Sequence, residues 1–158
     1  MSQFLNDSLS KQILREELFT GSHIFYSITK GSIEYLHIKT GSLECVFSVD
    51  IIVNASYIIS LYTGATTSAD GTSIPNYNMR ASSSETLLTT TFYTPTISVA
   101  GTSISSVKTG DDGRLSKASA FDSQNGVILD ANSSNIVSLH SQSAPLTSAS
   151  ITWFLREI

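Results

Sequence analysis

Three histidines and many hydroxyl groups are the residues of this chain that could do chemistry. His23, His37 and His140 lie in strand-like segments, and Ser and Thr are so frequent that each imidazole will have hydroxyl neighbours. A Ser-His-Asp site needs its three groups to converge, and the chain has neither a G-x-S-x-G elbow nor an H-E-x-x-H pair. We therefore expect structural or surface histidines and no enzyme; the alternative is a small hydrolase that uses His37 or His140 beside a hydroxyl.

The acidic and sulfur ligands of the chain give no clear metal pattern. Asp111 and Asp112 lie between glycines, and carboxylates in a loop can bind calcium. The pair lacks the alternating spacing of a calcium loop, so we expect a plain turn, with no metal and no cofactor. Cys45 is the single cysteine and lies in an alternating apolar run, which predicts a buried thiol and excludes an internal disulfide.

Charge and hydropathy limit the classes of partner. The net charge is -4 and the pI is about 5.2, so we expect no nucleic-acid partner, which would require a clustered basic surface. No run approaches the roughly 18 apolar residues of a membrane helix, and the first ten residues lack a signal-peptide pattern, so we expect no membrane partner and synthesis in the cytoplasm. The low charged fraction and abundant hydroxyls suit a β-protein whose subunits pack together.

Period-two alternation predicts a single domain over residues 21–158, an all-β, antiparallel β-sandwich of jelly-roll type with about eight strands. The segments Ile24 to Ile28 and Ile33 to Ile38 are expected to pair as a hairpin. The spans 63–84 and 101–125 are expected to be long surface loops, which tend to be functional or ordered by a partner. Residues expected to share a buried face are Cys45, Phe47, Val49 and Ile51 in one strand and Ile151, Trp153 and Leu155 in another.

Residues 1–20 are predicted to form an N-terminal arm or short helix. The apolar residues between Leu5 and Phe19 have helical spacing, and Ser8 could cap the start. A helix of this length is marginal alone in water, so the arm is expected to become ordered on a neighbour or on its own domain.

Aromatic residues in or beside the first loop could stack on a sugar or fill a pocket of a partner protein. Tyr57, Tyr62 and Phe92 are expected in the core. The sequence leaves Tyr77 and Tyr93 open between core and surface.

One stretch, residues 65–102, carries a pattern beyond composition. Thr-rich turns close on Asp-Gly-Thr and on Gly-Thr, an Asn/Arg segment ends in Ser-Ser, and a strand contains Thr-Pro-Thr. Together with the C-terminal third, this pattern resembles small head decoration, cement or head-fibre proteins of tailed bacteriophages. The matching residues are Tyr62, Thr66, Thr67, Asp70, Gly71, Thr72, Asn76, Asn78, Arg80, Ser82, Ser83, Thr91, Thr94, Pro95, Thr96, Gly101, Thr102, Leu129, Asn132, Ile136, Leu139 and Trp153.

The resemblance implies a structural protein of the virion, located on the capsid surface, that decorates or cements the shell. Its implied partners are the major capsid protein and further copies of itself, as a homo-oligomer such as a trimer. The alternative is a head-fibre, spike or tail module that binds a host surface glycan or another virion protein. Residues expected to contact partners are Leu9, Ile13, Leu14, Phe19, Tyr77, Asn78, Arg80 and Tyr93.

Overall fold

The computed structural model describes residues 11, 15–109, 116–121, 126–143 and 146–158 of the 158-residue chain, without the side chains of residues 116–121. In this part of the chain the regular elements are all strands, and no helix is present. The strands are β1 (Phe19–Ile28), β2 (Ile33–Lys39), β3 (Cys45–Val53), β4 (Tyr57–Thr63), β5 (Thr66–Ala69), β6 (Thr72–Ile74), β7 (Tyr77–Asn78), β8 (Thr90–Tyr93), β9 (Thr96–Val99), β10 (Thr102–Thr109), β11 (Ser116–Phe121), β12 (Val127–Leu129), β13 (Ser134–Ser141) and β14 (Thr147–Glu157).

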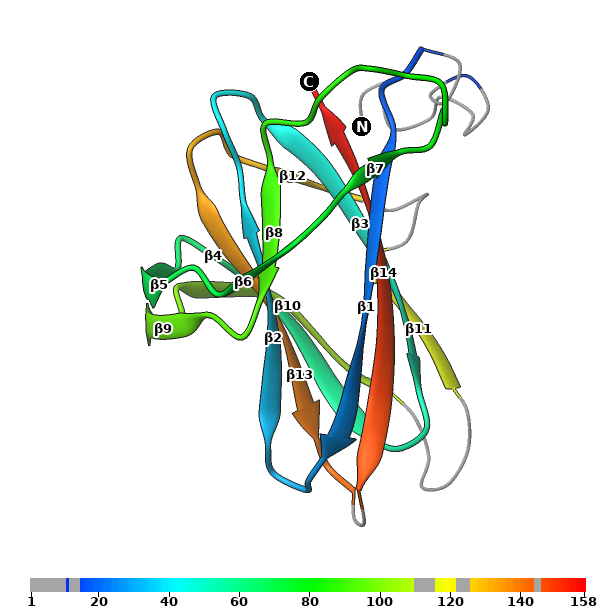
Figure 1. Cartoon of the computed structure of the whole chain (residues 1–158). Coiled ribbons are helices and arrows are strands. Elements are labelled where there is room, and N and C mark those ends of the chain that lie inside the picture. Colours follow the sequence, from blue (N-terminus) through cyan, green and yellow to red (C-terminus); the bar gives the residue numbers. More distant parts are fainter. Residues whose placement is uncertain (1–10, 12–14, 110–115, 122–125, 144–145) are drawn as a thin grey trace.

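The strands form two antiparallel sheets packed face to face, which confirms the all-β sandwich (Figure 1). Sheet A has the order β11-β3-β14-β1-β7, and β12 also pairs with β3. Sheet B has the order β10-β4-β13-β2-β8-β6. Strands β5 and β9 pair only with each other, as a two-stranded ribbon that protrudes from the sandwich (Figure 1).

The core lies between the inner faces of the two sheets. The predicted buried face of β3 is confirmed, because Cys45, Phe47, Val49 and Ile51 are all fully buried. Trp153 is the largest fully buried side chain, as the sequence predicts. Tyr57 and Cys45 belong to the same core. Burial raises the pKa of the Cys45 thiol to about 12, so this cysteine remains a neutral core residue.

The predicted hairpin between the first two strands is wrong, because β1 and β2 lie in different sheets. β1 pairs with β14, and β2 pairs with β13. Their connection turns the corner of the sandwich at Gly31, which has a positive φ of 85° and whose N–H donates to the carbonyl of Ser141 at 2.9 Å. The two strands therefore face each other's sheets across the core and do not pair within one sheet.

The two predicted long loops are also wrong, because both contain strands. The span 63–84 holds β5, β6 and β7, and the span 101–125 holds β10 and β11. β10 pairs with β4, and β7 pairs with β1, each far away in sequence. Such strands show no apolar alternation in their sequence, because pairing with the sheet that they join holds them in the strand conformation.

Candidate binding surface

A strap, defined as residues 72–78, joins the two sheets across one open side of the sandwich. β6 pairs with β8 at the edge of sheet B, and β7 pairs with β1 at the edge of sheet A (Figure 1). The chain between β6 and β7 therefore connects the edge of sheet B to the edge of sheet A.

Trp153 anchors the strap from the core of the sandwich by a hydrogen bond. Its indole Nε1–H donates to Asn76 Oδ1 at 2.7 Å, and Asn76 Nδ2 donates to Thr91 Oγ1 at 3.0 Å. Thr91 Oγ1 in turn donates to the carbonyl of Ile74 at 3.0 Å. The side chain of Asn76 thus has its oxygen and its nitrogen engaged, and the strap is a fixed part of the fold.

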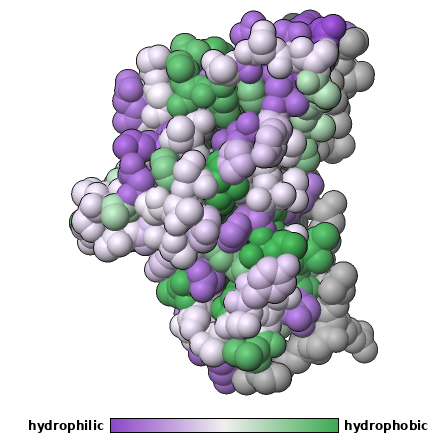
Figure 2. Space-filling view, in the orientation of Figure 1, coloured by the Kyte–Doolittle hydropathy of each residue, from purple (hydrophilic) through white to green (hydrophobic). Residues whose placement is uncertain are grey.

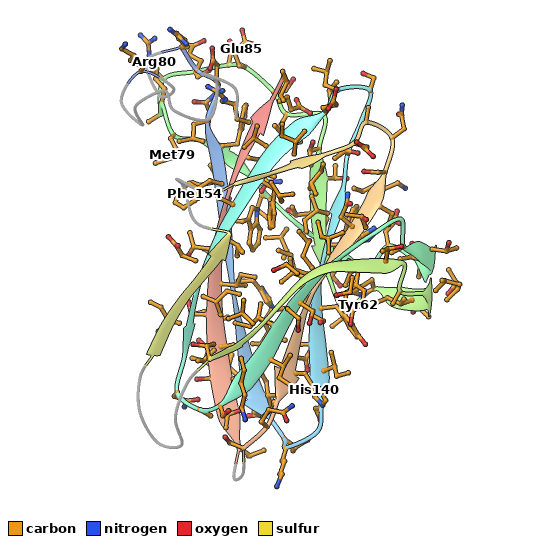
Figure 3. All side chains as sticks on the ribbon, turned by 180° about the vertical axis from the view of Figure 1, so that it is seen from behind. Tyr62, Met79, Arg80, Glu85, His140 and Phe154 are labelled. Carbon is orange, nitrogen blue, oxygen red and sulfur yellow. The ribbon has the colours of Figure 1, made fainter. Side chains whose placement is uncertain are left out.

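The strap also fixes the chain that enters β1. Asn78 Nδ2 donates to the carbonyl of Glu16 at 2.8 Å, and Met79 N–H donates to the carbonyl of Leu18 at 2.9 Å. The Arg80 guanidinium lies 3.6 Å from the Glu16 carboxylate. Figure 3 shows Met79, Arg80 and Glu85 together at one end of the molecule, with His140 towards the opposite end.

Arg156 makes a second attachment for the entering chain. Its Nη1 donates to Glu17 Oε2 at 3.2 Å, and its side chain is only 3% exposed. A nearly buried guanidinium needs such contacts, because leaving its charge uncompensated costs several kcal/mol. Residues 16 to 18 are therefore part of the sandwich and not part of a free arm.

The predicted partner-binding residues do not all behave alike. Leu9, Ile13 and Leu14, with most of the predicted helix, lie outside the described residues. Phe19 requires a correction: it begins β1 and packs in the core at 6% exposure, so its ring mainly contacts the chain's own core and only its small exposed part lines the surface. Its apolar side chain is buried because position 19 falls on the inner face of the sheet.

Of the other four predicted residues, Tyr77 and Asn78 belong to the strap, and Arg80 and Tyr93 lie beside it. Asn78 and Arg80 contact the chain's own Glu16, a use that the sequence does not reveal. Tyr77 is 65% exposed and has the most accessible ring of the strap. Tyr93 lies opposite Thr72 in the sheet, and its ring stacks on His23 with centroids 4.2 Å apart. Tyr77 is therefore the predicted side chain most available to a partner.

A shallow groove of about 370 Å³ lies between the strap and the segment 83–91. Phe19, Ile74 and Leu87 contribute apolar surface, and Tyr77 also lines it. The carboxylate of Glu157 fixes the far wall: it accepts from the N–H groups of residues 88 and 89 at 2.9 and 3.0 Å. Ser, Thr and Asn side chains make up much of the rest of the lining, so the groove offers both polar and apolar contacts.

A second cluster has the geometry of a nucleophile and a base. His37 Nε2 lies 2.6 Å from Ser134 Oγ, and His37 Nδ1 lies 3.1 Å from the carbonyl oxygen of Asp70. A carbonyl only accepts, so Nδ1 carries the proton, and the Ser134 hydroxyl donates to Nε2 of the neutral ring. The Asp70 carboxylate is bound by Lys39 Nζ at 3.2 Å, which lowers the pKa of that carboxyl.

The burial of His37 argues against catalysis at this cluster. The imidazole is fully buried, so a substrate does not reach Nε2, where a general base must exchange its proton. Its neighbours instead connect the turn after β5 to sheet B, and the N–H of Ala65 adds a bond to the carbonyl of Ser134 at 3.0 Å. We therefore interpret the cluster as a clasp that holds the ribbon on the sandwich.

The clasp predicts a stability that falls in mild acid. Burial lowers the pKa of His37 below its ordinary 6.5, so the folded state disfavours the protonated ring. Its contribution is complete above about pH 6.5 and is lost as the pH falls towards the lowered pKa. Urea unfolding at about pH 7.5 and pH 5 should show a drop in free energy that is smaller for His37→Gln. The facing Asp70 stays charged in this window because its pKa is lowered. An unchanged drop in the variant would remove His37 as the cause.

The described residues hold neither a cluster of metal-binding side chains nor a membrane-spanning helix. Across them, no three His, Cys, Asp or Glu side chains gather as a metal site requires. The same residues contain no helix long and apolar enough to cross a membrane. Asp111 and Asp112 lie outside the part that the structure describes.

No protein-family model matches this chain, and neither does any curated protein or solved structure. Sequence reasoning missed the roles of Asp70, Ser134, Glu157 and Arg156. The one signal in the sequence is the pair Asp70-Gly71, which is typical of a turn. The structure confirms the turn, because Gly71 has a positive φ.

Proposed function

We propose that this chain is a structural protein of a tailed-bacteriophage head that decorates the capsid and binds the major capsid protein. The order of the eight strands with six or more residues carries the proposal. They run β1-β14-β3-β11 in one sheet and β2-β13-β4-β10 in the other, which is the order of a jelly roll. Jelly rolls are common in viral capsid and lectin domains.

The motif residues of the resemblance support the same proposal, because they shape the ribbon and the strap. A Cβ on Gly71 would lie 2.3 Å from the carbonyl oxygen of Tyr93, and one on Gly101 would lie 2.2 Å from that of Thr63. Asn76 binds Trp153. The residues of the pattern thus form the turns that shape the ribbon and the strap. Proteins that share the pattern would therefore share the ribbon and the strap.

The strap end of the molecule suits contact with a capsid. The anchored segment 15–18, the exposed Tyr77 ring and the groove lie together there. Residues 1–14 precede this segment in the sequence, and on this proposal they contact a neighbouring protein. Weak contacts of this kind gain avidity when a symmetric shell repeats them. On this proposal the protein is made in the host cytoplasm and ends on the capsid surface as a homo-oligomer.

Binding to undecorated heads tests the proposal. Purified protein should bind saturably, and quantitative mass spectrometry with electron cryo-microscopy should find on the order of hundreds of copies on the shell, as icosahedral repetition requires. Failure to bind heads under any ionic condition, or absence from virions, would contradict it. A few copies at a vertex or tail would favour a fibre.

The exposed Tyr77 beside the groove favours one alternative, a fibre module that binds a host glycan. An exposed ring can stack on a sugar. On that alternative, Tyr77→Ala abolishes binding to a glycan array, whereas Tyr26→Ala does not, since Tyr26 is 72% exposed on β1 away from the groove. An array without signal removes this alternative.

A further inference from the structure

The edge strand β10 is open on both faces. Each of its eight residues is exposed or half-buried. One edge pairs with β4, and among the described residues no strand pairs with the other edge. A free edge offers a row of main-chain N–H and C=O groups to any strand that approaches.

The surface at this edge consists of hydroxyl and apolar side chains, and Lys108 is the one charged residue of β10. Val107 is 37% exposed, Ile104 is 48% exposed, and Val99 on the adjoining ribbon is 59% exposed. No charged residue lies between Glu85 and Lys108 in the sequence. In Figure 2 the protruding ribbon is pale, which marks residues of intermediate hydropathy. Natural proteins protect an open edge with charges or bulges; here the bulge near Ile104 leaves Ser105 to Thr109 in regular register with β4.

The net charge of the chain does not prevent a second copy from pairing at this edge. Each copy carries a net charge of -4, so two copies repel each other except where their facing surfaces carry no charge. Apart from Lys108, the edge of β10 meets that condition. In an antiparallel pair centred on Val107, Lys108 of each copy lies opposite Ser106 of the other, so the two ammonium groups do not face each other.

We propose that β10 pairs antiparallel with β10 of a second copy of this chain. The two copies of sheet B then form one continuous sheet across a twofold axis, in which the same strand serves both sides. Val107 and its symmetry mate lie next to each other at the centre. The proposed function already includes a homo-oligomer; this inference names its contact and is tested on the purified chain alone, so its failure is distinguishable from a failure to bind heads.

The exchange Val107→Lys tests the contact. It sets two like charges opposite each other, which should raise the dimer dissociation constant by about 100-fold. Sedimentation equilibrium should give a dimer for the wild type and a monomer for the variant at the same concentration. The matched control is Ile128→Lys on β12, where the side chain is 43% exposed on sheet A, and it should remain dimeric. Circular dichroism checks that both variants fold.

Cysteine cross-linking is a second test, and it detects the contact directly instead of by the loss of the dimer. Val107→Cys should form a disulfide-linked dimer under mild oxidation, whereas Ile128→Cys should not. The natural Cys45 is fully buried and does not compete. A wild type that is monomeric at every concentration, an odd-numbered oligomer, or a dimer that Val107→Lys leaves intact would each overturn the proposal.

Discussion

Gly21→Ala should destabilise the fold by about 2–3 kcal/mol, the usual cost of forcing an extra group into a packed core. A Cβ at position 21 would lie 2.6 Å from both Cε2 and Cζ2 of Trp153 and 2.7 Å from Asn76 Oδ1. Neither neighbour can retreat easily, because the indole is fully buried and is hydrogen-bonded to Asn76. Urea unfolding should show a lower midpoint with an unchanged slope.

A double-mutant cycle separates this clash from other effects of the substitution. Phe at position 153 lacks the outer ring of the indole, so Gly21→Ala should cost less than about 1 kcal/mol in a Trp153→Phe background. Gly31→Ala is the control: it meets no atom within 4 Å but has a φ of 85°, so its cost is conformational and should not depend on residue 153. Additive effects of positions 21 and 153 would contradict the steric explanation.

The sequence predicts those strands whose burial alternates. Cys45, Phe47, Val49 and Ile51 are all buried, because a strand with one wet face must place every second residue in the core. The same rule predicts Trp153 as a core residue. It says nothing about which strands pair, so the predicted hairpin of β1 and β2 fails: the partner of β1 is β14, at the other end of the chain.

The candidate surface was predictable only in part. The pattern that includes Asn78 and Arg80 indicates a stretch with a role, and these residues do lie together with Tyr77 on or beside the strap. Their contacts with Glu16 depend on how β7 meets β1, which is a tertiary arrangement. The clasp at His37 has the same origin, since Ser134 is 97 residues away in sequence.

Removal of residues 1–14 should leave the sandwich folded and weaken binding to undecorated heads by at least about tenfold, since the removed segment would supply one of several linked contacts. The cut falls before the segment that the strap holds. Glu16, Glu17 and Leu18 keep their contacts with Asn78, Arg156 and Met79. The unfolding midpoint of the truncated chain should therefore match that of the full chain.

A cut five residues later should have a different effect. Leu18 and Phe19 are 4% and 6% exposed, so their loss should cost more than about 5 kcal/mol, which is comparable to the whole stability of a domain. Deletion of residues 1–19 is therefore expected to unfold the protein, and its failure to bind heads would say nothing about the arm.

The shorter deletion needs a control for chain length as well. A full-length variant with Leu9, Ile13 and Leu14 changed to Ser keeps the length of the arm but removes its apolar side chains. If those side chains contact the capsid, this variant should bind as weakly as the chain without residues 1–14. Full affinity in both would show that the arm is dispensable and would move the capsid contact to Tyr77 and the groove.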